Sequence, residues 1–343
     1  MNGYPTLLPN MLPDLTVVDY TDASSSARLR TIAAEAERVD GYAPLNEQAL
    51  FDLAAGTRTA WIATSTGAAR ARGDSTPGDA ARSDAVPLDT ALLVLGDGEL
   101  DLVVHPEHRR LGVATAILGT VFSEPSIVGA EGVSTAWAHG DHPGARVLAH
   151  RYQFEAARTL LQLRLVLTDS HSASVPPTEA QRAQPPGARI EAFRPGHDDV
   201  DWVDLNALVF ADHPEQGGLT LDDLAARQQE PWFEAGDFLI ARDDSGRMVG
   251  YNWLKIEENL GEIYVVGVHP GVAGHGLGRA LMRAGLARLH ERGCRTAALY
   301  VEADSLGPVH LYRSLGFTDF TVDVQYRRVA DRDPVSEMFT QFG

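Results

Sequence analysis

The sequence predicts an α/β fold that occurs twice in one chain. Each half contains a β-rich run, a His-Pro dipeptide, a glycine-rich turn and an apolar stretch at helical spacing. The two copies keep the same internal spacing, since 269 minus 105 and 276 minus 112 both give 164. A length of 343 residues suits two domains at roughly 150 residues each. We therefore expect a tandem duplication rather than a short solenoid repeat.

The elements are clearest in the second copy. Apolar residues from Leu277 to Leu289 recur near one helical face, which predicts a helix from near Gly276 to Gly293. The stretch TAALYVEA, residues 296–303, predicts a buried strand. The stretch LYRSLGFTDF, residues 311–320, predicts a short helix closed by Gly316 before another strand. This alternation of strands and helices is typical of α/β domains.

Two segments lack the composition of packed elements. Residues 172–188 hold four prolines and few apolar residues, so we place a linker there, between domains at 1–171 and 189–343. Residues 67–87 are rich in Gly, Ala and Asp, which predicts a long surface loop between two strands.

Composition excludes several classes of protein. The formal net charge of -18 disfavours nucleic acid as a partner. The sequence has no apolar run of the roughly 18 residues that a membrane span needs, and its first residues do not resemble a signal peptide. Cys294 is the single cysteine, and the histidines form no metal-binding motif. We therefore expect a cytoplasmic protein without a metal, in which Cys294 is a packed residue. A monomer is a separate expectation, which composition does not decide.

Both glycine-rich turns lie where a strand feeds a helix. Unpaired backbone N–H groups and the helix dipole favour a phosphate at such a place. The turns are RRLGVA, Arg109 to Ala114, and AGHGLG, Ala273 to Gly278. Neither a P-loop nor a complete G-x-G-x-x-G is present, which disfavours P-loop NTPases and Rossmann dinucleotide sites.

The turns resemble the pyrophosphate loop of the GCN5-related N-acetyltransferase superfamily. Seven strings resemble, in order, a tandem branch of that superfamily: DGYAPLNEQAL at Asp40, DLVVHPEHRR at Asp101, WAHG at Trp137, HPEQGG at His213, LGEIYVVGVHP at Leu260, LYVEADS at Leu299 and LYRSLGF at Leu311. The resemblance implies two acetyltransferase domains, each a mixed, splayed sheet flanked by helices, with a bulge in the strand before the loop. It also implies acetyl-CoA as co-substrate and, as acceptor, the cysteine amine of a small pseudodisaccharide thiol, cysteinyl-glucosaminyl-inositol.

The resemblance also implies the acetyl-CoA contacts. In the first copy they are Leu102, Val103, Val104, Arg110, Leu111, Gly112, Val113, Ala114 and Thr115. In the second copy they are Val266, Gly267, Val268, Ala273, Gly274, His275, Gly276, Leu277, Gly278, Arg279, Ser305, Leu306, Gly307, Pro308, Val309 and His310. The second loop departs from the family pattern at Ala273-Gly274, where Gln or Arg and then Arg are more usual.

Carried over by position, the acceptor-binding set is Glu47, Glu215, Lys255, Glu262 and Tyr300. Because Glu47 belongs to the first copy, we expect the acceptor between the domains. An α-amine with a pKa of about 8 is mostly protonated at neutral pH, so the reaction needs a base. Glu262 is the candidate base, and the Tyr312 phenol is the candidate acid for the departing thiolate. Backbone donors around Gly267 are expected to stabilise an oxyanion.

The two copies differ at these positions. Alignment of LYRSLGF with the matching stretch LAHRYQF places Ala149 at the position of Tyr312. Glu262 lies six residues before Val268, and its counterpart by the repeat spacing is Gly98. The first copy then lacks both proton-transfer groups, and the hypothesis is that only the second copy is catalytic. Two alternatives stay open: an acetyltransferase for another small amine or a peptide N-terminus, and a non-catalytic acyl-CoA-binding protein.

Overall fold

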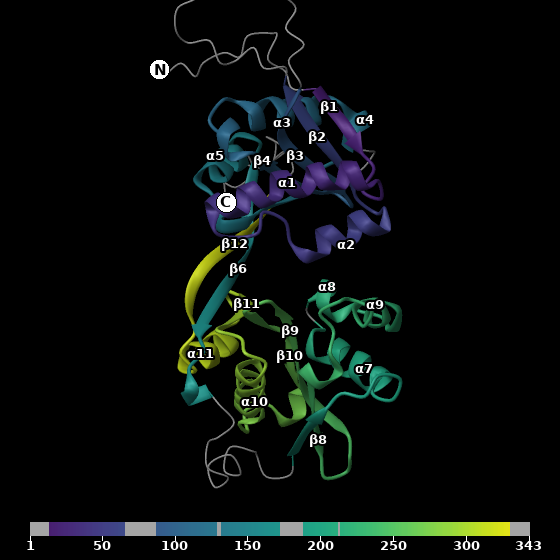
Figure 1. Cartoon of the computed structure of the whole chain (residues 1–343), viewed down its shortest axis with the longest axis vertical. Helices are drawn as coiled ribbons and strands as arrows, with labels where there is room; N and C mark the ends of the chain where they lie inside the picture. The colour runs from purple at the N-terminus through teal and green to yellow at the C-terminus, as the bar shows by residue number, and fades with distance from the viewer. Residues whose placement is uncertain (1–13, 66–86, 129–131, 172–187, 212, 330–343) are drawn as a thin grey trace, which may run out of the picture. The chain divides into compact units, whose positions relative to one another are not determined.

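The computed structural model describes residues 14–65, 87–128, 132–171, 188–211 and 213–329. These residues form two compact units (Figure 1). Unit 1 comprises residues 1–159 and 321–343, and unit 2 comprises residues 160–320. The expected linker at 172–188 lies outside the described residues except for Ala188, and the expected loop at 67–87 does so except for Pro87.

Unit 1 is a mixed sheet with helices on both faces. Its elements are β1 (Asp14–Val18), α1 (Ala23–Asp40), α2 (Glu47–Ala55), β2 (Thr59–Ser65), β3 (Leu88–Gly96), β4 (Glu99–Val104), α3 (Val113–Ser123), α4 (Pro125–Val128), β5 (Thr135–Ala138), α5 (Pro143–Arg151) and the end of β12 (Thr318–Arg328). The strand order is β1-β2-β3-β4-β5-β12. One core packs α1 and α2 on the sheet, and another packs α3 on the opposite face.

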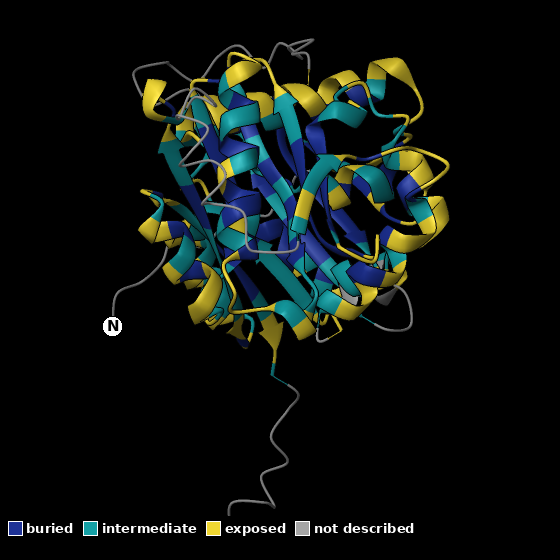
Figure 2. Ribbon diagram, turned by 90° about the horizontal axis from the view of Figure 1, so that it is seen from below, coloured by how far each residue is buried: buried dark blue, intermediate teal, exposed yellow. Residues whose placement is uncertain are grey.

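Unit 2 repeats this plan. Its elements are β6 (Phe154–Val166) from Leu160 on, β7 (Ala188–Ala192), α7 (Asp199–Val209), α8 (Pro214–Gly217), α9 (Leu221–Arg227), β8 (Phe238–Asp243), β9 (Met248–Glu257), β10 (Leu260–Val268), α10 (Leu277–Glu291), β11 (Thr296–Glu302) and α11 (Leu306–Ser314). The strand order is β6-β11-β10-β9-β8-β7. Helices α7 and α9 cover one face and α10 covers the other. Buried residues gather on the strands and on the helix sides against them (Figure 2).

The last strand of each copy pairs in the unit formed mainly by the other copy. Leu160–Val166 of β6, which ends the first copy, pair antiparallel with β11 in unit 2. Val324–Arg327 of β12, which ends the second copy, pair antiparallel with β5 in unit 1 (Figure 1). The units therefore divide the chain differently from the boundaries at 171 and 189 that the linker composition indicates.

The predicted elements of the second copy are present. Helix α10 runs from Leu277 to Glu291 and is followed by Gly293 at φ +83°. Strand β11 covers the predicted buried strand. Helix α11 begins at Leu306, five residues before the predicted start at 311, because Pro308 falls in its first turn, where proline is tolerated. It ends before Gly316, at φ +98°, as predicted.

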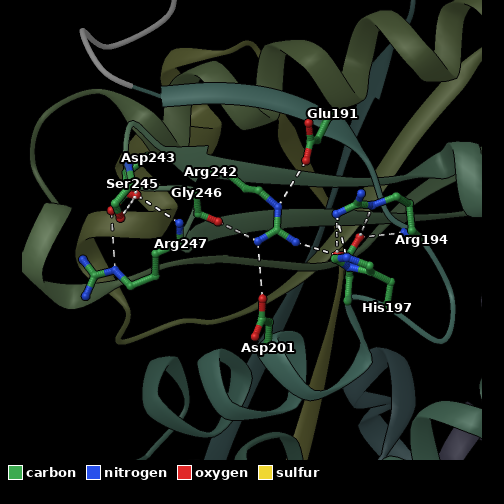
Figure 3. A network of polar contacts seen from close by, with 10 residues as sticks. Glu191, Arg194, His197, Asp201, Arg242, Asp243, Ser245, Gly246 and Arg247 are labelled. Atoms are coloured by element: carbon green, nitrogen blue, oxygen red, sulfur yellow. Dashed lines mark hydrogen bonds and ion pairs between the residues drawn. The ribbon is translucent and has the colours of Figure 1, made fainter.

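A buried ion cluster fixes the edge of unit 2. The Arg242 guanidinium contacts the carboxylates of Asp198, Glu191 and Asp201 and the carbonyl of Gly246 (Figure 3). The Asp198 carboxylate is fully buried and also accepts bonds from Arg194 and His197. Burial by itself would raise the pKa of Asp198, but the hydrogen bonds from Arg194 and His197 lower it to about 2. The cluster thus joins β7, β8 and the start of α7. The buried Asp198 charge in it is stabilised only by the side chains that contact it.

Asp198→Asn is expected to destabilise the protein at neutral pH. A carboxyl whose pKa falls from 3.8 to about 2 on folding contributes roughly 2 kcal/mol above pH 4. That contribution disappears as the pH falls through the folded pKa. The difference in unfolding free energy between wild type and variant should therefore shrink by roughly 2 kcal/mol between pH 5 and pH 2 in urea titrations.

The exposed neighbour Asp244 provides the control. Asp244→Asn should stay within roughly 0.5 kcal/mol of the wild type at each pH. A pH-independent difference for Asp198→Asn would contradict the proposed role of the ionised carboxylate.

Candidate functional site

The His-Pro dipeptides place the two glycine-rich turns in the same conformation. Ring atom Nδ1 of His105 accepts the Glu107 N–H at 3.3 Å, and Nδ1 of His269 accepts the Gly271 N–H at 2.9 Å. Each histidine thus caps the short turn after its strand. Both glycines that precede the following helix are left-handed, Gly112 at φ +85° and Gly276 at φ +90°.

The unusual start of the second loop does not change its backbone. Gly274 has φ +81°, and Arg110 at the matching position of the first loop has φ +60°, a region that a side chain disfavours. In unit 1 the Arg109 guanidinium, which Ala273 replaces in unit 2, binds both carboxylate oxygens of Asp40 at 2.6 and 2.7 Å. The two loops therefore present the same backbone cradle, whatever their side chains.

Each helix after a loop begins without a side-chain cap. Neither α3, after Gly112, nor α10, after Gly276, has a side chain that accepts its first N–H groups. Such helix starts favour an anion, because the N–H groups and the helix dipole point at it. Both loops fit the pyrophosphate that the resemblance implies.

Parallel strands separate directly beside each loop. Among the described residues, β10 pairs with β11 at Leu260–Glu262 only, and β4 pairs with β5 at Glu99 and Leu100 only. Beyond these pairs the strands diverge, as the resemblance predicts. The predicted bulge is present in β10, where the register with β9 shifts between Ile263 and Val265. The register of β4 with β3 is continuous, so the first copy has no such bulge.

A cavity of about 500 Å³ lies in unit 1 at this divergence. Its lining includes every acetyl-CoA residue predicted for the first copy except Leu111. Its remaining lining includes residues of β5, α5 and α3, the segment from Asp40 to Pro44, and Tyr326 of β12. The cavity has a size typical of ligand sites.

In unit 2 the candidate base lies in a row of polar residues across the sheet. Glu262 is directly opposite Lys255 on β9, because a two-residue turn, Glu258-Asn259, joins the strands. Glu262 also lies beside Ala298 on β11, and Ala298 pairs with Arg164 on β6. Since Ile263 is buried beneath α10 and strand side chains alternate, Glu262 faces away from α10. The structure thus brings together Lys255 and Glu262 of the predicted set.

Tyr300 extends this polar surface. It lies on β11 two residues after Ala298, on the same face, and its side chain is 44% exposed. The Gln162 amide Nε2, on β6, donates to the Tyr300 hydroxyl at 2.7 Å. Sequence reasoning missed Gln162 because nothing local in the sequence indicates that β6 pairs with β11. The signal was available, since Gln162 and Gln325 are separated by 163 residues, the same spacing as Ala149 and Tyr312.

Tyr312 is on α11 and packs in the core beneath α10. It is 8% exposed, and burial raises the pKa of its phenol to about 12. Tyr312 belongs to the core on the α10 side, whereas Glu262 faces away from α10, so the candidate acid and base come from opposite faces of the sheet. The counterpart of Tyr312, Ala149, lines the unit 1 cavity.

The correspondence of Glu262 with Gly98 is wrong. Ala298 matches Thr135, since 298 minus 135 gives the same 163 as 312 minus 149. Glu262 pairs with Ala298, and Glu99 pairs with Thr135, so Glu99 is the true counterpart. The bulge adds one residue to β10 and shifts the alignment of everything before it by one.

The Glu99 carboxylate is bound by neighbouring side chains, an arrangement that does not suit a general base. Its carboxylate accepts bonds from Arg58 Nη1 and Trp137 Nε1, each at 3.0 Å, and Gln325 Nε2 lies 3.4 Å away. The Arg58 side chain is 3% exposed. The first copy has the carboxylate but keeps it in an ion pair with the buried Arg58, and it lacks the phenol.

The other predicted residues occupy element ends. Glu47 opens α2 in unit 1, after the cap Asn46. Glu215 is in α8, and the Asn206 side chain holds this turn through the carbonyl of Gln216 at 2.6 Å. A Cβ at Gly217 would lie 2.3 Å from the Phe210 carbonyl oxygen, so this glycine in HPEQGG serves close packing. The stretch from Ser305 to His310 forms the first turns of α11.

Metal and membrane features were searched in the described ranges. No cluster of three or more His, Cys, Asp or Glu side chains suited to a metal is found there. Within the same ranges, no helix is both long and apolar enough to span a bilayer. Cys294 is buried, as predicted, and burial raises the pKa of its thiol.

Comparisons with known proteins agree with this geometry. The Acetyltransferase (GNAT) family matches residues 202–317. A mycothiol acetyltransferase of Clavibacter sepedonicus is 41% identical, over 96% of this chain and 100% of that protein. One from Thermomonospora curvata is 40% identical, over 90% of this chain and 96% of its own length. The chain belongs to the mycothiol acetyltransferase family.

Two solved structures are similar in fold to this chain. A GCN5-related N-acetyltransferase from Sphaerobacter thermophilus superposes with a TM-score of 0.65 at 20% identity, covering 93% of this chain and 96% of its own. A tandem GNAT protein from the clavulanic acid pathway gives 0.62 at 18% identity, covering 91% and 97%. The predicted tandem acetyltransferase fold is confirmed, and the chain is an acetyl-CoA-dependent N-acetyltransferase.

Gly267→Ala is expected to destabilise unit 2. A Cβ there would lie 2.6 Å from Cζ of Tyr251, whose buried hydroxyl donates to Asn206 Oδ1 at 2.8 Å, so the ring has no room to move. Overpacking of this kind costs roughly 1–3 kcal/mol. Urea unfolding would measure it.

Gly278→Ala is the matched control within the same predicted contact set. Its Cβ would meet nothing nearer than 3.6 Å, and alanine favours the helix. Equal stability of Gly267→Ala and wild type would show that Tyr251 does not limit this strand.

Proposed function

We propose that the chain transfers acetyl from acetyl-CoA to the cysteine amine of cysteinyl-glucosaminyl-inositol, the last step of mycothiol biosynthesis. The observation that carries the proposal is the end of the β10–β11 pairing at Glu262, in a sheet whose α10 face holds Tyr312 in its core. The names of relatives at about 40% identity over nearly the whole chain support the acceptor. We also propose that the enzyme acts in the cytoplasm, as a monomer and without a metal.

In this mechanism acetyl-CoA supplies the acyl group as an activated thioester. Glu262 removes the proton from the acceptor ammonium. Lys255, directly opposite it on β9, belongs to the proposed acceptor set. Tyr312 gives a proton to the departing thiolate. Backbone N–H groups of β10 beyond Glu262, where pairing with β11 stops, are the oxyanion donors. Glu47, Glu215 and Tyr300 complete the proposed acceptor set.

We propose catalysis in unit 2 alone. Unit 1 offers Ala149 in place of Tyr312, and its Glu99 is paired with Arg58. Its cavity, which eight of the nine residues predicted in the first copy line, nevertheless supports binding of acetyl-CoA there. The first copy is then a binding domain without turnover.

Mass spectrometry of the full chain with acetyl-CoA and the cysteinyl conjugate should detect one added acetyl group on the amine. Tyr312→Phe and Glu262→Gln should each lower kcat by roughly 10²- to 10⁴-fold, the usual contribution of a positioned acid or base. Glu99→Gln is the matched control in unit 1 and should leave kcat within about threefold of the wild type if the variant is folded.

Each alternative has its own outcome. Near-normal turnover by the Tyr312→Phe, Glu262→Gln double variant would refute the catalytic assignment. Bound acetyl-CoA with no acetylated conjugate would withdraw the acceptor and favour another amine or a binding role.

The Tyr312 phenol, the candidate acid, is expected to stay protonated at mildly alkaline pH. With a pKa of about 12, the Tyr312 phenol keeps its proton below pH 10, so the loss of kcat in Tyr312→Phe should be the same factor from pH 7 to pH 10. A kcat profile of wild type and variant measures this ratio. A ratio that falls toward one by pH 9 would mean that the phenol ionises and does not act as the acid.

A further inference from the structure

The last strand of each copy pairs in the unit formed mainly by the other copy, and we call this pairing the strand exchange. It brings a residue of the first copy into the proposed acceptor surface. Gln162 lies on β6, opposite Tyr300 on β11, and both belong to unit 2. Its side chain is nearly buried, with 7% exposure, and Nε2 is 2.7 Å from the Tyr300 hydroxyl oxygen. A buried amide that meets an exposed phenol is suited to set that phenol's orientation.

The amide oxygen of Gln162 lowers the stability of the fold. Its Oε1 is buried and has no hydrogen-bond partner among the residues that the structure describes. A buried acceptor without a partner destabilises a fold, and an apolar side chain of similar size would avoid the loss. The glutamine therefore has a use besides packing, and its contact with Tyr300 supplies one.

The first unit contains the same constellation with different contacts. Gln325 on β12 pairs with Trp137 on β5, just as Gln162 pairs with Tyr300. There the amide and the indole N–H both approach the Glu99 carboxylate. Internal comparison thus aligns Gln162, Tyr300 and Glu262 with Gln325, Trp137 and Glu99, so the glutamine belongs to the same group as the candidate base.

We infer that Gln162 is a positioning residue of the acceptor site, which holds the Tyr300 hydroxyl so that its proton points to an oxygen of a polyhydroxylated acceptor. The inference rests on the proposed function, which places Tyr300 against the acceptor. Because the phenol oxygen accepts the amide N–H on one side, its own O–H is directed to the other side. Gln162 acts through Tyr300 and touches no reacting atom.

The kinetic test uses the full chain with acetyl-CoA and the cysteinyl conjugate. In Gln162→Leu the KM for the acceptor should rise about tenfold, the loss of one positioned hydrogen bond, while the KM for acetyl-CoA stays unchanged. The double variant with Tyr300→Phe should be no worse than Tyr300→Phe alone. An unchanged acceptor KM, or additive effects of the two changes, would overturn the inference.

Two further variants test whether Gln162 is the hydrogen-bond donor and whether the effect on the acceptor KM is specific to unit 2. Gln162→Glu accepts but does not donate, so it should raise the acceptor KM at least as much as leucine does; an unchanged KM would overturn the donor role. Gln325→Leu removes the equivalent buried amide in unit 1 and should leave the acceptor KM unchanged. An equal rise in both leucine variants would indicate a general structural effect and refute the inference.

A readout without the acceptor separates this inference from the proposed function. With 3-fluorotyrosine at position 300, the ¹⁹F resonance should shift in Gln162→Leu and not in Gln325→Leu. If wild type acetylates no conjugate, the proposed function fails, and the resonance alone decides whether Gln162 sets the hydroxyl. No shift in Gln162→Leu would refute the contact.

Discussion

The shortness of the parallel pairing between β10 and β11 determines the chemistry of unit 2. Three residue pairs join these strands before they diverge. Glu262 is the last residue of β10 that pairs with β11, so the candidate base lies where the gap between these two strands begins. Tyr312 belongs to the core on the α10 side of the same sheet. A longer pairing would close the gap and bury the strand edges that a thioester needs, whereas an earlier end would leave Glu262 unsupported.

The bulge and the ion pair explain how two copies of one fold came to differ. An extra residue in β10 moves every earlier side chain by one position relative to the loop, and β4 has no such insertion. Glu99 therefore occupies the position of Glu262 in the sheet, and yet it is locked by Arg58. The loss of activity proposed for the first copy is an occupied carboxylate together with a missing phenol, rather than the absence of both groups.

Local patterns predicted the loops, helix α10 and strand β11 well, because His-Pro, glycine and helical spacing act over a few residues. The tandem acetyltransferase fold followed from the resemblance and was confirmed. Two features depend on distant residues and were missed. A bulge has no fixed sequence signal, so counting back from Val268 gave Gly98 instead of Glu99. The strand exchange depends on which edge β6 pairs with, and that choice left Gln162 out of the candidate set. Assignment of Glu47 and Glu215 still depends on resemblance.

The strand exchange bears on how such a chain could arise. Each copy ends in a long strand that completes the sheet of the other, so a single copy made alone would have an unpaired sheet edge and a strand without its partner. Two identical single copies would satisfy both needs by giving each other their last strands, as in a domain-swapped homodimer. Gene fusion then preserves every strand pair and makes the two halves inseparable. With assembly secured within one polypeptide, one half is free to lose its acid group and still supply the strand that completes the other sheet.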